Sequence, residues 1–156
     1  EAATIHRKWL KERRDDYSPQ VRRRIEIGLG IPATRYLEAL SLRSHHLQLY
    51  NNAAFSHSDV VMLPTVGEEA PTLSELDVGD SDELPQMLRR LTGYTRPINY
   101  YGLPSINIPG GFSDNGLPLG FQIIGRPYHE GLLFQMAAAF QHITDYHKKS
   151  PELSGG

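Results

Sequence analysis

The stretch that decides the fold is GLPSINIPGGFSDNGLPLGFQIIGRPYHE, residues 102–130, in which short apolar runs lie between glycines and prolines. Two of these runs, residues 105–108 (SINI) and 121–124 (FQII), are candidate strands. The tripeptide DNG at residues 114–116 is a strong turn signal. The stretch therefore predicts two buried strands that pair through this turn and lead into a final helix.

Working outward, the final helix is expected over residues 131–147, because its apolar side chains fall on one face and its last turn is basic. That face comprises Leu133, Met136, Ala137, Phe140 and Ile143. On the other side, the run VVML at residues 60–63 is brief, β-branched and stopped by Pro64, which predicts a further buried strand. Residues 65–85 are acidic and aperiodic and are expected to form a surface loop, followed by a helical turn or two over residues 86–95.

Three helices are expected before the first strand. Residues 2–14 have a narrow apolar stripe, and Ser18 and Pro19 stand where the N-cap and first position of a second helix belong. A long amphipathic helix is expected from Pro32 to about residue 55. The apolar positions are Ile5, Trp9 and Leu10 in the first helix, and Ala33, Leu37, Leu40, Leu47 and Ala54 in the long one.

Composition limits the classes of protein. The 156 residues are 39% hydrophobic and 22% charged, which is typical of a soluble globular domain. The net charge of −2 argues against nucleic-acid binding, which we keep as a minority alternative because the N-terminal helices carry basic runs. There is no cysteine and no apolar run of 18 residues, so we expect no disulfide, no thiolate metal site and no membrane span, and a cytoplasmic location. Without an initiator Met, the chain is expected to be a piece of a longer one.

Candidate chemical motifs are weak when they are considered one by one. No phosphate-binding glycine motif is present, and GFSDNG at residues 111–116 has one residue too many for a nucleophile turn, so Ser113 is expected to form a turn. Residues 56–59 (SHSD) contain Ser, His and Asp, but triads assemble from distant positions. The histidines are not spaced as metal ligands on a helix. From the residues alone, nothing assembles a nucleophile, a base and an oxyanion hole, and no metal or cofactor is expected.

Several motifs in order resemble the C-terminal portion of the amidase signature family. They are NYYGLP at residues 99–104, IPGGF at 108–112 and DNGLPLGFQIIG at 114–125, followed by Glu130 and preceded by DVVMLPT at 59–65. The resemblance covers nearly the whole chain, so we expect residues 1–153 to be a C-terminal amidase segment and residues 154–156 a flexible tail. It implies an α/β class, with an α/β/α sandwich around a mixed sheet and flanking helices.

The resemblance also implies an activity, namely the hydrolysis of a carboxylic amide, in particular of linear amides, or transfer of its nitrogen. Family members use a Ser–cis-Ser–Lys triad, in which a serine forms an acyl-enzyme. The glycine- and serine-rich segment that carries this triad is absent from the 156 residues, so no catalytic residue is assigned and the chain alone is expected to be inactive.

The substrate funnel of the family is partly built by the segment before the NYYGLP motif. The resemblance makes Thr92 and Tyr94 candidate substrate-binding residues, and Asn99 either a third one or a structural residue that satisfies backbone groups. Glutamine-handling relatives have an acidic residue near the position of Thr92, so its absence favours a less polar amide. Tyr101 and Gly111 depart from the family pattern near the expected floor of the pocket.

The expected partners are a small-molecule amide and the missing N-terminal amidase part, on the same or on another chain. A second copy of the chain, in a homodimer, is an open alternative. The rival interpretation of the whole chain is a non-catalytic scaffold or partner-binding subunit of an amidase or amidotransferase complex.

Overall fold

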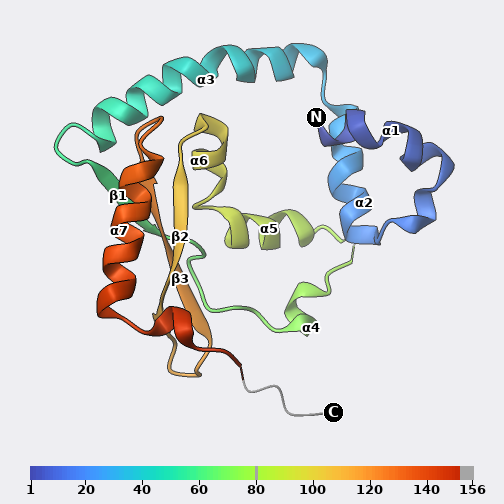
Figure 1. Cartoon of the computed structure of the whole chain (residues 1–156). Coiled ribbons are helices and arrows are strands. Elements are labelled where there is room, and N and C mark those ends of the chain that lie inside the picture. Colours follow the sequence, from blue (N-terminus) through green and yellow to red (C-terminus); the bar gives the residue numbers. More distant parts are fainter. Residues whose placement is uncertain (80, 152–156) are drawn as a thin grey trace. The chain divides into compact units, whose positions relative to one another are not determined.

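The computed structural model describes residues 1–79 and 81–151, drawn in Figure 1. The chain divides into two compact units, one made of residues 1–45 and 71–89 and the other of residues 46–70 and 90–156. The expected tail at residues 154–156 lies outside the described residues. No helix in the described ranges combines the length and the apolar character that a membrane crossing requires.

The first unit is helical. The bounds of its α-helices are Ala2–Glu12 (α1), Pro19–Glu26 (α2), Ala33–Ala54 (α3), Leu73–Leu76 (α4) and Leu84–Thr92 (α5). Both α3 and α5 continue into the second unit, α3 from residue 46 and α5 from residue 90. In addition, 3₁₀ turns lie at Arg14–Asp16 and Ile27–Gly30. Ser18 is confirmed as the N-cap of α2, because its Oγ accepts from the N–H of Val21 at 3.5 Å.

The buried face of α1 differs from the expected stripe. Ala3 and Leu10 are the buried residues, whereas Ile5 and Trp9 are exposed. The reason is a close approach: a Cβ on Gly28, in the turn after α2, would lie only 2.8 Å from Cβ of Ala3. The face of α1 that contains Ala3 therefore packs against the turn after α2, where both residues at the contact are small.

The expected loop over residues 65–85 is wrong in part, because it contains α4 and the start of α5. A capping box begins α4: Thr72 Oγ1 accepts from the N–H of Glu75 at 3.3 Å, and the N–H of Thr72 donates to Glu75 Oε2 at 2.8 Å. Gln20 Nε2 on α2 donates to the carbonyl of Leu76 at 2.7 Å. A helix of four residues is too short to show a hydrophobic period, so only its caps identify it.

The second unit is built on a three-stranded antiparallel sheet. Its strands are Val60–Pro64 (β1), Ser105–Phe112 (β2) and Pro118–Gly125 (β3), in the order β1-β3-β2. The predicted strands and their turn are confirmed, and Gly116 in that turn has φ 77°. Both β2 and β3 are longer than expected. Pro109 is tolerated within β2 because β2 is an edge strand of the described sheet.

Helical elements cover both faces of this sheet within the second unit. Helix α7 (Glu130–Ile143) packs Leu133 and Ala137 on one face, against Ile108 and Ile123. A second buried cluster comprises Phe55, Ile98, Leu103 and Ile124. Ile124 faces away from its neighbour Ile123, because successive side chains of a strand point to opposite faces of the sheet. The α/β class is therefore confirmed, although the three described strands are antiparallel. Ile143, which was expected on the buried face of α7, ends the helix and is 81% exposed.

Helix α3 is confirmed as a helix, but none of its residues is fully buried. The expected apolar positions divide: Leu37 and Leu40 are exposed, whereas Leu47 and Ala54 pack against the cluster around Phe55. Apolar periodicity predicts the helix without showing what covers it.

Candidate functional site

The segment that carries the three candidate substrate-binding residues joins α5 to α6 (Arg96–Tyr101). The joint is tight: the N–H and the Oγ1 of Thr95 both donate to the carbonyl of Thr92, each at 3.2 Å. Pro97 lies in the first turn of α6, where its missing N–H costs no hydrogen bond. Gly102 ends α6 with φ 72°, and its N–H reaches the carbonyls of Ile98 and Asn99.

The structure places the candidates on this one segment with different exposures. Thr92 is half-buried at the end of α5, and Tyr94 is 43% exposed. Asn99 is exposed on α6. Its N–H donates to the carbonyl of Thr95 at 3.0 Å, and its carbonyl accepts from the N–H of Gly102 at 3.2 Å. The candidates thus share one short segment, and their role in binding stays a prediction.

A buried glutamine that the sequence reasoning did not single out supports this segment. Gln122, on the central strand β3, donates through Nε2 to the carbonyl of Tyr94 at 3.2 Å and to that of Pro64 at 3.3 Å. Its Oε1 accepts from the Oγ of Ser105 at 3.1 Å. The signal that could have found it is a polar residue within the apolar run FQII.

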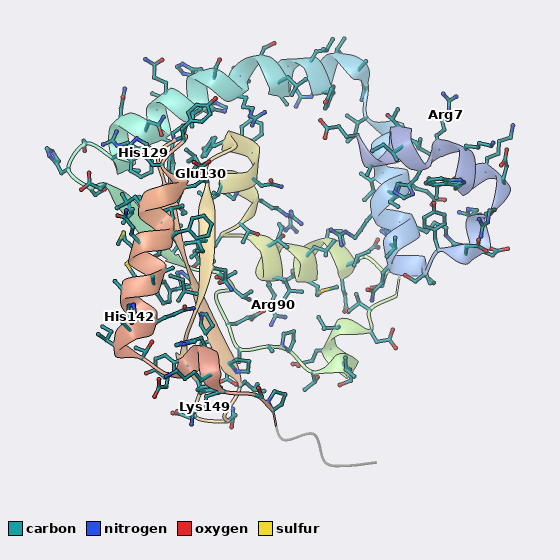
Figure 2. All side chains as sticks on the ribbon, viewed as in Figure 1. Arg7, Arg90, His129, Glu130, His142 and Lys149 are labelled. Carbon is teal, nitrogen blue, oxygen red and sulfur yellow. The ribbon has the colours of Figure 1, made fainter. Side chains whose placement is uncertain are left out.

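The loop after β1 approaches the same segment. A Cβ on Gly67 would lie 2.7 Å from Cε2 of Tyr94, so the ring lies directly against this glycine. Glu68 accepts from Arg90 at 2.7 Å and 3.2 Å, and Figure 2 shows Arg90 on α5. Thr65, at the start of the loop, donates to Oδ1 of Asn107 on β2. The loop is therefore attached both to the sheet and to α5.

The hydroxyl groups dismissed as nucleophiles have local structural roles. The N–H of Leu117 donates to Ser113 Oγ at 3.2 Å, which confirms Ser113 as a turn residue. Ser56 and Ser58 donate to carbonyls in the last turn of α3. His129 and His142 lie at opposite ends of α7 (Figure 2), and no group of three or more His, Asp or Glu suited to a metal ion occurs in the described ranges.

Tyr101, one of the departures from the family pattern, packs within an aromatic group. Its ring centroid lies 5.1 Å from that of Tyr50, which is 6.0 Å from that of Phe55. Burial, and then the neighbouring Tyr101, raise the pKa of Tyr50. The other departure, Gly111, lies at a register shift of β2 with φ 149°, where a side chain would strain the backbone.

Comparison with known proteins identifies the family. A sequence model described as Amidase matches residues 1–134, so the chain belongs to the amidase family. A glutamyl-tRNA(Gln) amidotransferase subunit of Streptococcus equi subsp. zooepidemicus is 36% identical over 162 aligned residues, which cover 100% of this chain and 32% of that protein. The chain thus spans about a third of the length of the curated relatives it matches.

Solved structures agree with the fold. A crystal structure of an amidase matches with a TM-score of 0.75 and 26% identity, over 90% of this chain and 32% of the other. The corresponding glutamyl-tRNA(Gln) amidotransferase subunit from Thermotoga maritima matches with a TM-score of 0.57 and 34% identity, over 81% of this chain and 27% of the other.

Proposed function

We propose that the chain forms part of an amidase-family enzyme that hydrolyses a carboxylic amide, in particular a linear one, through a serine acyl-enzyme. In this proposal it supplies scaffold and part of the substrate pocket, through Thr92, Tyr94 and Asn99. The match of the family model to residues 1–134, in a chain about a third as long as its relatives, carries the proposal.

The remainder of the enzyme, on the same or on another chain, would supply the catalytic groups. A Ser–cis-Ser–Lys triad needs a lysine beside its bridging serine, and every lysine of this chain is exposed near one of its ends. They are Lys8, Lys11, Lys148 and Lys149. This exposure supports the proposal that the chain alone is inactive.

The test replaces the aligned segment of the Streptococcus equi subsp. zooepidemicus relative with residues 1–156 and measures ammonia release from hexanamide, benzamide and glutamine. The unaltered relative and the isolated chain are the controls. We expect the chimera to release ammonia and the isolated chain to release none. A folded chimera that releases no ammonia from any amide would contradict the proposal, as would turnover by the isolated chain that is lost on replacing one of its own serines.

The second candidate is a component of an amidotransferase complex, and the names of the matched relatives favour it. The same chimera distinguishes the two candidate functions. If the chain belongs to an amidotransferase, glutamine should release ammonia fastest of the three amides. The non-acidic Thr92 supports the opposite order, in which hexanamide or benzamide exceeds glutamine.

A further inference from the structure

The feature that carries a further inference is the side-chain amide of Gln122. At 3% exposure Gln122 is the single buried polar residue within residues 1–79 and 81–151. It stands on the middle strand, opposite Leu63 of β1 and Asn107 of β2. A buried amide without partners is costly, so its hydrogen bonds decide whether it stabilises or destabilises the sheet.

The hydrogen bonds of Gln122 fix its orientation. The carbonyls of Tyr94 and Pro64 can only accept, so the amide nitrogen must face them, with one N–H for each. The remaining oxygen accepts from the hydroxyl of Ser105. The three partners lie in segments far apart in the sequence, so Gln122 links β2, the end of β1 and the joint between α5 and α6.

At that joint, Gln122 holds the backbone of Tyr94 from the sheet side. The ring of the same residue lies against Gly67, whose missing side chain makes room for it. In the unaltered chain, the bond to the carbonyl and the contact of the ring with Gly67 together give the exposed part of the ring its direction. The ring offers a flat apolar surface, which suits an amide with an apolar acyl group.

We propose that Gln122 is a positioning residue that fixes Tyr94, and with it residues 92–95, in the conformation that receives the acyl group of an amide substrate. This rests on the proposed function for its catalytic meaning. Its structural content, a side-chain clamp on the Tyr94 carbonyl, is independent of any activity.

The first experiment uses the unaltered chain and NMR. The two Nε2 protons of Gln122 are expected to give separate resonances that exchange slowly with solvent and show NOEs to residues 94 and 95. A Gln122 side-chain amide that exchanges as fast as an exposed one would overturn the proposal.

The second experiment measures amide hydrogen exchange in Gln122→Met, which keeps the length of the side chain but removes both donors. Loss of one hydrogen bond predicts roughly five- to tenfold faster exchange at the Thr95 and Asn99 amides than at the β1–β3 ladder. Ser105→Ala is the matched control, because it removes only the bond to Oε1, and it is expected to leave Thr95 unchanged. Uniform acceleration throughout the second unit, or none, would refute the clamp.

The third experiment places Gln122→Met in the active chimera. We expect KM for hexanamide to rise about tenfold with kcat changed less than about threefold, because binding geometry rather than chemistry is disturbed. Equal losses in both, or no change in KM, would overturn the positioning role. A chimera that is inactive without the substitution contradicts the proposed function alone, since the NMR experiments test the clamp directly.

Discussion

Two glycines of the second unit make a matched pair on which the packing argument can be tested. A Cβ added to Gly67 would lie 2.7 Å from Cε2 of Tyr94, and one added to Gly110 would lie 2.7 Å from Cδ1 of Phe121. Both contacts are too short to persist. Replacing each glycine by alanine therefore applies the same clash to two different aromatic rings.

The rings differ in their freedom to move. Tyr94 is 43% exposed, so its ring can turn toward solvent at about 0.5–1.5 kcal/mol, while alanine gains about 0.4–1 kcal/mol by restricting the unfolded chain. Gly67→Ala should therefore change the free energy of unfolding by less than about 1 kcal/mol. Phe121 packs edge-on against Phe140 of α7, with centroids 5.1 Å apart. Overpacking there costs about 1–3 kcal/mol, so Gly110→Ala should destabilise by about 1–2 kcal/mol.

The assay is urea unfolding at 25 °C, followed by circular dichroism, with the midpoints compared at an unchanged m value. Gly131→Ala is the control, because a Cβ there meets nothing within 4 Å and lies on α7, where alanine should stabilise by up to about 1 kcal/mol. All three glycines belong to the second unit. If Gly67→Ala destabilises as much as Gly110→Ala, the argument from ring mobility is refuted.

The remaining predictions concern the core, a cap and a phenol. Ile124→Ala, at a fully buried position, should lower the free energy of unfolding by about 2–5 kcal/mol in urea, and a loss below about 1 kcal/mol would contradict the packing described. Ser18→Ala should cost about 0.5–1 kcal/mol, because its capping bond is long, and Ser18→Gly should recover part of it. The pKa of Tyr50 is raised by burial, so above about pH 10 the unfolded chain loses this proton first and stability falls as pH rises. In Tyr50→Phe the free energy of unfolding should fall less between about pH 8 and about pH 10.5 than in the unaltered chain. The same pH dependence in both proteins would contradict a raised pKa of Tyr50.

The sheet was the most predictable part of the fold. The runs at residues 60–63, 105–108 and 121–124 all fall within observed strands, because short apolar runs between breakers have few alternatives. The extension of β2 through Pro109 was not predicted, since proline and glycine usually end a strand. In β2 the proline and the glycines are accommodated because the strand lies at the edge of the described sheet and its register shifts at Gly110. Both properties depend on pairing with β3, so the sequence of β2 alone does not predict them.

The short helices were missed for a different reason. Helix α6 has six residues and α4 has four, too few for a hydrophobic period. Their signals were local: Pro97 and Gly102 bound α6, and the pair Thr72 and Glu75 begins α4. Both elements are therefore predictable from their capping residues rather than from a hydrophobic period.

The candidate site came almost entirely from the family resemblance. Thr92 and Tyr94 carry no chemical pattern of their own, and their joint is defined by contacts from β3 and from the loop after β1. Gln122 could have been suspected as a polar residue in an apolar strand. Its partners could not, since they lie 17, 28 and 58 positions away in the sequence.

The glycines of residues 102–130 explain why this stretch, to which no catalytic residue was assigned, still resembles the amidase family. One group adopts positive φ and comprises Gly102, Gly111 and Gly116. A second group makes room for a neighbouring side chain: Gly110 for Phe121, Gly120 for Asn107 and Gly125 for Leu133. These are requirements of the sheet and of its packing, and they hold whether or not an amide is cleaved. The motif therefore identifies the scaffold, and the activity has to be tested on the groups that the scaffold positions.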